Sequence, residues 1–194
     1  EEYLKRLSSM GSRSEAGTTA CVVMIAGTTM YVANCGDSRA VLSRGGVALS
    51  LTSDHKAARP DEVARICRAG GFVVRNRVLG SLAVSRALGD PSFKSTGTPR
   101  ASKPALVSPE PQMVRTSLSS ADEFVVLGCD GLFDVLDSQA VIDATREQLS
   151  GGASLRDVAR HLAELALSKG SADNVSVVVV SIGDGVAKGA ATRT

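Results

Sequence analysis

Hydrophobic and polar positions repeat along this chain with two different periods, and the two periods separate strands from helices. Residues 19–25 and 29–35 alternate β-branched and small residues on either side of residues 26–28, which predicts a β-hairpin. A further strand is predicted at residues 39–43, shortly after Asp37. The first part of the chain therefore favours paired antiparallel strands.

A helical pattern begins at Pro60. Val63, Ile66 and Cys67 share one face of this segment, and two glycines follow at residues 70–71. Proline at the start and glycine past the end are typical of a helix, here of about three turns. Its charged positions are expected to form a solvated face containing Arg59, Arg65 and Arg68.

The second half of the chain changes to longer periodic segments. Residues 123–129 form a short, mostly apolar run, which predicts a strand buried on both faces. Two amphipathic helices are predicted at residues 138–149 and 155–169. Ser154 and Asp157 form a capping box at the start of the second helix.

The last strand is predicted at residues 174–182, and residues 183–194 are expected to form a flexible C-terminal tail. Hairpins come first, and paired helices then return to a strand. This order favours the α+β class with a mainly antiparallel sheet, and a parallel βαβ fold is the weaker alternative. The length favours one domain, expected over residues 1–182.

Composition and charge exclude several classes of protein. Of the 194 residues, 43% are hydrophobic and 22% are charged, which is typical of a globular chain and excludes a disordered one. The net charge of +2 gives no electrostatic reason to bind nucleic acid or anionic lipid. An aromatic content of 3% also argues against base stacking.

The cysteines and the apolar runs indicate the cellular setting. The four cysteines form no Cys-x-x-Cys pair and are too sparse for a disulfide framework: Cys21, Cys35, Cys67 and Cys129. A reducing compartment fits best, so the cytoplasm is expected, with the nucleus as a second option. The longest apolar run, around residues 177–180, is too short to cross a bilayer, and we expect a monomer with no membrane contact.

Three aspartates stand at predicted strand ends. Asp37 and Asp130 each follow a strand, and Asp173 comes just before the last strand. Carboxylates at such junctions can turn their oxygens into a cleft, and oxygen ligands suit Mg²⁺ or Mn²⁺ better than Zn²⁺. Each aspartate taken alone can equally belong to an ordinary turn, so these residues by themselves leave both interpretations open.

Five short segments carry a more specific signal. They are residues 33–39 (ANCGDSR), 51–56 (LTSDHK), 81–90 (SLAVSRALGD), 129–135 (CDGLFDV) and 170–175 (GSADNV). In their order and approximate spacing they resemble the motifs of the metal-dependent, type 2C protein serine/threonine phosphatases. The resemblance covers the chain from about residue 17 to about residue 182, and five motifs in register are far more specific than one.

The resemblance implies a fold and a set of site residues. The fold would be a sandwich of two antiparallel β-sheets flanked by helices, with a binuclear Mg²⁺ or Mn²⁺ centre at one end. Asp130 and Asp173 would be direct metal ligands, and Asp37 would serve a further, weaker metal position shared with Asp130. Asp134 would hold metal-bound water, and the resemblance implies a catalytic role for this residue. No other cofactor is implied.

The resemblance also implies an activity. Phosphoserine and phosphothreonine in protein substrates would be hydrolysed directly, with no phosphoenzyme. Two cations would lower the pKa of a bridging water and neutralise charge on the phosphoryl group. Residues 85–111 would correspond to a mobile flap beside the active site, and four of its residues are expected to influence substrate access: Ser85, Arg86, Gly89 and Asp90.

Two motifs of the family are absent from these 194 residues: the Asp-Gly-His-Gly motif and an arginine-containing N-terminal motif. Neither His55 nor His161 matches the family's catalytic histidine. Because the chain begins at Glu1, we expect the missing motifs upstream in a longer parent protein, so that this catalytic domain is N-terminally incomplete. This piece alone is then expected to have little or no phosphatase activity. The alternative is a pseudophosphatase that acts as a binding or regulatory module.

Overall fold

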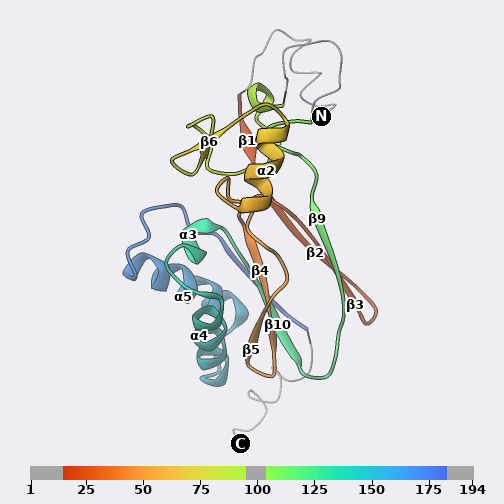
Figure 1. The fold of residues 1–194 in the computed structure, drawn as a ribbon. Helices are drawn as coiled ribbons and strands as arrows, with labels where there is room; N and C mark the ends of the chain where they lie inside the picture. The colour runs from red at the N-terminus through yellow and green to blue at the C-terminus, as the bar shows by residue number, and fades with distance from the viewer. Residues whose placement is uncertain (1–14, 95–103, 183–194) are drawn as a thin grey trace, which may run out of the picture. The chain divides into compact units, whose positions relative to one another are not determined.

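A computed structural model describes residues 15–94 and 104–182, so the predicted tail at residues 183–194 lies outside the described residues. The described chain divides into two compact units. The first contains residues 15–20, 34–37, 54–94 and 104–112, and the second contains residues 21–33, 38–53 and 113–182. Figure 1 shows the elements in chain order, and each unit is described here by itself.

The second unit is built around two sheets. One has four antiparallel strands in the order β11-β10-β4-β5, with bounds Val177–Ser181, Asp122–Gly128, Arg39–Arg44 and Val47–Ser50. The other has three strands in the order β2-β3-β9, with bounds Ala20–Ala26, Thr29–Cys35 and Gln112–Ser117. The predicted hairpin and the predicted buried strand are confirmed, each within one residue. Strands β5 and β9 were not predicted.

Alternation along β4 and β10 explains why both faces of the four-stranded sheet are apolar. Leu42 and Val125 point into a cluster shared with Met30 and Val32 of β3, which fills the space between the sheets. Their strand neighbours point to the opposite face and join the helices there. A strand buried on both faces therefore reads as a continuous apolar run, as the sequence of β10 does.

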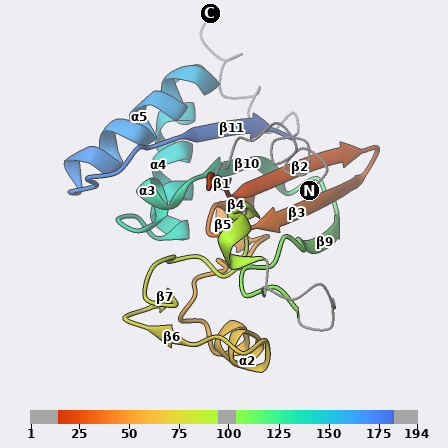
Figure 2. The same ribbon diagram turned by 90° about the horizontal axis from the view of Figure 1, so that it is seen from above.

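Three helices follow β10 and return the chain to β11: α3 (Asp130–Phe133), α4 (Ser138–Ser150) and α5 (Leu155–Ser168). Side chains of α4 and α5 pack on Phe124 and Val126 of the sheet. Figure 2 shows these two helices running along the sheet that contains β10 and β11. The Ser154 hydroxyl accepts the Asp157 amide N–H at 3.2 Å, so the predicted capping residue begins α5.

The first unit has little regular structure. Its elements are α2 (Pro60–Arg68), the pairs β1 (Gly17–Thr18) with β8 (Leu88–Gly89) and β6 (Val73–Val74) with β7 (Arg77–Val78), and a 3₁₀ turn at Pro91–Phe93. One small apolar cluster lies beneath them, formed by Ala57, Ile66, Val78, Ala87 and Val107. The helix predicted at Pro60 is confirmed, whereas the two-residue strands were not predicted.

The buried face of α2 differs from the expected one. Ile66 is buried, but Cys67 is exposed. The residues that share the buried face with Ile66 are Glu62, four positions before it, and Ala69, three positions after it. The expectation that Arg59, Arg65 and Arg68 form one solvated face is wrong for Arg65, which pairs with the buried Glu62 carboxylate at 2.8 Å, and for Arg59, which lies 3.6 Å from the same carboxylate; Arg68 is exposed as expected. A buried carboxylate requires a cationic partner, and this requirement turns Arg65 inward.

Candidate metal centre and its flanking segments

Asp130 is positioned by the central strand of the four-stranded sheet. Strand β10 is hydrogen-bonded on both sides, to β4 and to β11, and it ends directly before α3. The Gly131 amide N–H donates to Asp130 Oδ1 at 2.9 Å, and the Asp134 N–H donates to the Asp130 carbonyl oxygen at 2.8 Å. Asp130 is thus fixed in the first turn of α3, and Asp134 follows one turn later at its exposed end.

Asp173 lies in the loop that leads into β11, and this loop is bonded to the β10–α3 junction. Ser171 Oγ donates to the Gly131 carbonyl at 2.7 Å, and the Cys129 amide donates to the Ser176 carbonyl at 3.2 Å. Gly131 permits this approach, because an added Cβ would lie 2.4 Å from the Asn174 carbonyl oxygen. The structure therefore brings the segments that carry Asp130 and Asp173 into contact within the second unit.

The same contacts explain why β11 begins at Val177 and not at residue 174 as predicted. Residues 174 to 176 bond to the junction instead of to a neighbouring strand: Cys129 Sγ donates to the Asn174 carbonyl and accepts the Ser176 amide, both at 3.2 Å. The Asn174 amide donates back to Asp173 Oδ1 at 2.7 Å. Asp173 thus has one carboxylate oxygen fixed by its own loop.

Arg39 supports the α3 turn and was not among the predicted site residues. It stands opposite Gly128 in the β4–β10 pairing, and its guanidinium carbon lies 4.6 Å from the centroid of the Phe133 ring. Arg39 Nη1 also donates to Ser138 Oγ at 3.2 Å. The Arg39 side chain therefore links the first residue of β4 to the last residue of α3, Phe133, and to the first residue of α4, Ser138. Only the strand register reveals this role, so sequence patterns alone could not indicate it.

Asp37 belongs to the first unit, where it is 5% exposed and pairs with Lys56 Nζ at 3.1 Å. Gly36, at a φ of 120°, precedes it, and a Cβ there would lie 2.3 Å from the Thr19 side chain. The Gly36 carbonyl accepts hydrogen bonds from Asn34 Nδ2 at 3.0 Å and from the His55 amide N–H at 3.0 Å. The backbone around Asp37 is thus tightly held.

His55 has a structural place in this arrangement. The Gly36 amide N–H lies 3.2 Å from His55 Nδ1, and the imidazole is fully buried. Burial lowers the pKa of His55, so the neutral ring is favoured. His55 Nδ1 can accept from the Gly36 amide N–H or, when it carries the ring proton, donate to the Gly36 carbonyl at 3.0 Å. Within the described residues, His55 Nε2 and Asn34 Oδ1 are buried without a hydrogen-bond partner.

The predicted flap begins in a charged cluster that sequence patterns missed. Glu62, 1% exposed, accepts from Arg65 Nη2 at 2.8 Å and from Arg86 Nη2 at 2.7 Å. Arg65 also donates to the carbonyls of Ser85 and Ala105, both at 2.8 Å. Burial alone would raise the pKa of Glu62, but hydrogen bonds from the two arginines outweigh it and leave the pKa lowered. A signal was present: Glu62 takes a position on the Ile66–Ala69 face of α2.

The other predicted flap residues are also anchored. Ser85 is buried, and its hydroxyl donates to the His55 carbonyl at 2.9 Å. The Asp90 amide donates to the Ala16 carbonyl at 3.0 Å, and Gly89 at a φ of 83° leaves no room for a Cβ, which would lie 2.3 Å from that same oxygen. Residues 95–103 of the predicted flap lie outside the described residues. The role of these residues in substrate access stays a prediction.

The donors of the second unit fit a hard divalent cation. Asp130 and Asp173 offer carboxylate oxygens from contacting backbone segments, and Mg²⁺ is commonly held by one or two carboxylates plus water. Among the described residues, no group of three or more His, Cys, Asp or Glu side chains is arranged to hold a metal ion. Asp37 lies in the other unit, so its convergence with Asp130 stays a prediction.

Comparisons with known proteins fit the fold and the motifs. A family model described as Protein phosphatase 2C matches residues 1–175. Protein phosphatase 1B of Mus musculus is 43% identical over 181 residues, covering 93% of this chain and 46% of that protein. Probable protein phosphatase 2C 8 of Oryza sativa subsp. japonica is 43% identical over 180 residues, covering 86% of this chain and 42% of that protein.

A solved structure of a C. elegans sex determining protein aligns with a TM-score of 0.81 at 28% identity, covering 97% of this chain and 46% of that chain. The chain is an α+β protein of antiparallel sheets and helices, with aspartates where β10 ends and before β11 begins. The chain belongs to the protein phosphatase 2C family. It spans about half the length of the curated relatives named here. In the described part of the chain, no helix combines the length and the apolar character needed to cross a membrane.

Proposed function

We propose that this chain carries part of the catalytic domain of a metal-dependent protein serine/threonine phosphatase. The observation that supports this most directly is the bonding between the β10–α3 junction and the loop before β11, which carry Asp130 and Asp173. Family membership supports the same reaction class. The substrates would be phosphoserine and phosphothreonine in proteins, and we expect a cytoplasmic or nuclear monomer with a single catalytic domain.

Asp130 and Asp173 would hold Mg²⁺ or Mn²⁺, and Asp37 would take part in a further ion position. Two such ions supply a deprotonated water near neutral pH and positive charge for the phosphoryl group. Asp134, at the exposed end of α3, would orient water beside that centre. These assignments use only carboxylates at strand and helix ends, where the backbone can fix their direction.

The chain's own contacts prepare these carboxylates for that role. The Gly131 amide directs Asp130 Oδ1, and the Asn174 amide directs Asp173 Oδ1. Ligating carboxylates are generally oriented by such hydrogen bonds, because an ion bound by freely rotating groups would have to order them first. Arg39, stacked on Phe133, would keep the α3 turn in register with β4.

We infer that these 194 residues alone have little or no phosphatase activity. The Asp-Gly-His-Gly word is absent from them, and in the family it supplies a bridging aspartate and the usual general acid. A single carboxylate pair would then bind Mn²⁺ weakly. The alternative, a pseudophosphatase in the complete protein, is distinguished by sequencing the residues encoded upstream and searching them for that word.

The test is Mn²⁺-dependent hydrolysis of a phosphothreonine peptide by the complete parent protein, with and without chelator. Asp130→Asn should lower kcat/KM by about a hundredfold or more, because a neutral amide is a poorer ligand for a hard cation. Asp143→Asn is the matched control: it makes the same charge change on the exposed side of α4, where Asp143 bonds to Gln139. Equal activity of the two variants would remove Asp130 from the proposed site.

A further inference from the structure

The β6–β7 hairpin of the first unit presents an exposed face that is both apolar and basic. Val73 and Val78 are paired across the hairpin and point into the apolar cluster beneath it. By strand alternation, the opposite face carries Val74 paired with Arg77. Phe72 and Leu79 flank the two strands, and the Leu79 amide donates to the Phe72 carbonyl at 3.0 Å. We call Phe72, Val74, Arg77, Leu79 and the nearby Arg68 and Arg75 the hairpin face.

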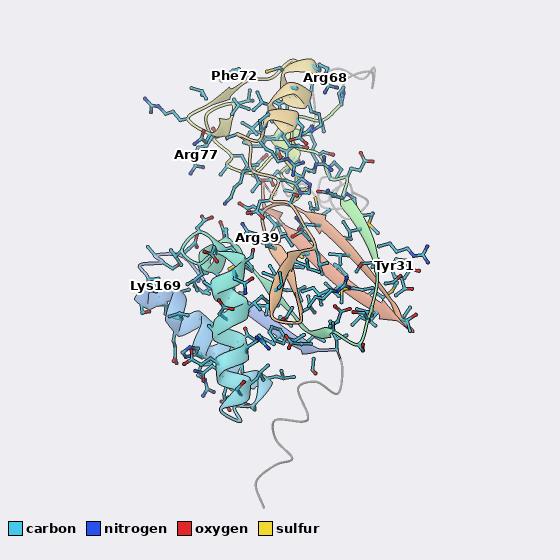
Figure 3. The ribbon with its side chains drawn as sticks, turned by 60° about the horizontal axis from the view of Figure 1, so that its bottom comes forward. Tyr31, Arg39, Arg68, Phe72, Arg77 and Lys169 are labelled. Atoms are coloured by element: carbon cyan, nitrogen blue, oxygen red, sulfur yellow. The ribbon has the colours of Figure 1, made fainter. Side chains whose placement is uncertain are left out.

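The apolar members of the hairpin face are exposed to solvent. Phe72 is 54% exposed, Val74 is 46% exposed and Leu79 is 38% exposed. Three exposed large apolar residues within one short hairpin are not single scattered exposures, which would need no explanation. Figure 3 labels Phe72, Arg68 and Arg77 on this part of the molecule, which also contains α2.

The charge of this region has one sign. Residues 63–89 contain five arginines and neither Asp nor Glu. Arg65 and Arg86 are occupied by Glu62, whereas Arg68, Arg75 and Arg77 are exposed. No ion pair joins any of these three to an acidic residue within the described chain, and Arg77 bonds only to a backbone carbonyl, that of Ser81 at 2.7 Å.

The turn of the hairpin places Arg75 at an energetic cost. Arg75 and Asn76 have φ values of 50° and 60°, the left-handed region that a two-residue hairpin turn requires and that glycine or asparagine adopts most easily. Leu79 also has a positive φ of 51°. Each such residue costs on the order of 1 kcal/mol. Such conformations persist only where the surrounding structure holds them, and here they keep Arg75 and Leu79 exposed.

We propose that the hairpin face docks an acidic polypeptide segment that contains large apolar side chains. Carboxylates of the segment would pair with Arg68, Arg75 and Arg77, and its apolar side chains would cover Phe72, Val74 and Leu79. Three apolar positions and only one aromatic ring favour a peptide over a single-stranded nucleic acid, which would need stacking platforms. This binding does not depend on phosphatase activity, so it can be tested on the 194-residue chain.

The experiment measures fluorescence anisotropy of a fluorescein-labelled peptide in which Asp and Glu alternate with Leu and Phe, at about 0.15 M ionic strength. Two comparison peptides replace either the acids by Asn and Gln or the apolar residues by Ser. We expect the parent peptide to bind, and either replacement to weaken it about tenfold or more. The double variant R75E/R77E should show the same loss, and Phe72→Ala a smaller one.

The matched control is R156E/R160E, which makes the same charge change at exposed positions of α5 in the second unit. Thermal unfolding of both double variants verifies folding, and amide shifts of residues 68–80 on titration locate the peptide. Equal binding by the two double variants, or equal binding of the Ser-containing peptide, would overturn the proposal. Displacement of the peptide by a short RNA or by phosphatidylserine vesicles at lower concentration would also overturn it, in favour of a general polyanion surface.

Discussion

The second unit buries two apolar clusters, of eleven and six buried residues, on the two faces of one sheet, whereas the first unit has one cluster of five and a buried carboxylate that pairs with three arginines. The second unit is therefore stabilised mainly by removal of apolar area from water, which does not depend on direction. The first unit relies on hydrogen bonds from Arg65 and Arg86 to Glu62 and on to backbone carbonyls, which depend strongly on geometry. Loss of a single polar partner should therefore matter more in the first unit.

Removal of the Glu62 carboxylate should have the largest effect. Glu62→Ala leaves the guanidinium groups of Arg65 and Arg86 half-buried without their anion, and we expect a loss of about 3–5 kcal/mol in the free energy of unfolding. Asp61→Ala is the control on the same helix, because Asp61 is 63% exposed and its pair with Arg59 should contribute less than about 1 kcal/mol.

Hydrogen exchange of the Glu62→Ala variant gives the comparison its sharpest test. Amides of residues 55–90 should lose protection, while amides of β4 and β10 keep theirs. Uniform loss of protection across both units would contradict the view that each unit is stabilised by its own interactions, and would show one cooperative structure instead.

A cavity in the second unit should have the next largest effect. Leu162 of α5 is fully buried against the four-stranded sheet, so Leu162→Ala should cost about 3 kcal/mol through lost burial and a residual cavity. Leu167→Ala makes the same substitution in the same helix at a position that is 57% exposed. Urea unfolding should place this control within about 0.5 kcal/mol of the wild type, and similar losses for both variants would contradict the assigned packing of α5.

Acid should weaken both units through one carboxylate in each. Burial favours a raised pKa for Asp122, as it does for Glu62, but hydrogen bonds from Arg44 and Ser119 outweigh it and the pKa of Asp122 is lowered. Since both folded pKa values lie below the unfolded ones, their stabilisation is complete above the unfolded values near pH 4 and is lost as pH falls further.

The free energy of unfolding should therefore begin to fall as the pH drops below about 6.5, where the unfolded chain protonates His55 and the folded chain does not, and it should fall further below about pH 4, where the two carboxylates lose their stabilisation. Urea titrations at a series of pH values measure this, and Glu62→Gln should flatten part of the acid limb. A flat response between about pH 7 and about pH 5 would contradict the lowered pKa of His55, and no further loss below about pH 4 would contradict the lowered pKa of Glu62 and Asp122.

Sequence patterns predicted the second unit better than the first for a physical reason. Strand β10 and helices α4 and α5 are long and regular enough for periodicity to identify them, and their ends fell within one residue of prediction. The β6–β7 hairpin has two-residue strands, for which no period can be read. Strand β9 has six residues but mixes polar and apolar ones without a regular alternation, so it was missed for a different reason.

The site shows the same division. Asp130 and Asp173 could be selected because their neighbours in the sequence form motifs. The hydrogen bonds between their segments join the β10–α3 junction to the loop before β11. Arg39 acts through Ser138, which is distant in the sequence, so only tertiary structure reveals its role. Glu62 lies on the Ile66 face of α2, but its partner Arg86 is likewise distant in the sequence. The inward turn of Arg65 follows from the same buried anion, whose need for a cationic partner hydrophobic periodicity does not show.

The different burial of three thiols, those of Cys67, Cys35 and Cys21, gives both units an internal chemical reporter. Cys67 is exposed on α2, whereas Cys35 is buried in the first unit and Cys21 is half-buried in the second, where burial raises its pKa to about 11. A maleimide dye should therefore couple first at Cys67, and the slower modification of Cys35 and Cys21 would follow the transient opening of each unit separately. The natural chain can in this way be followed by mass spectrometry with no added label site.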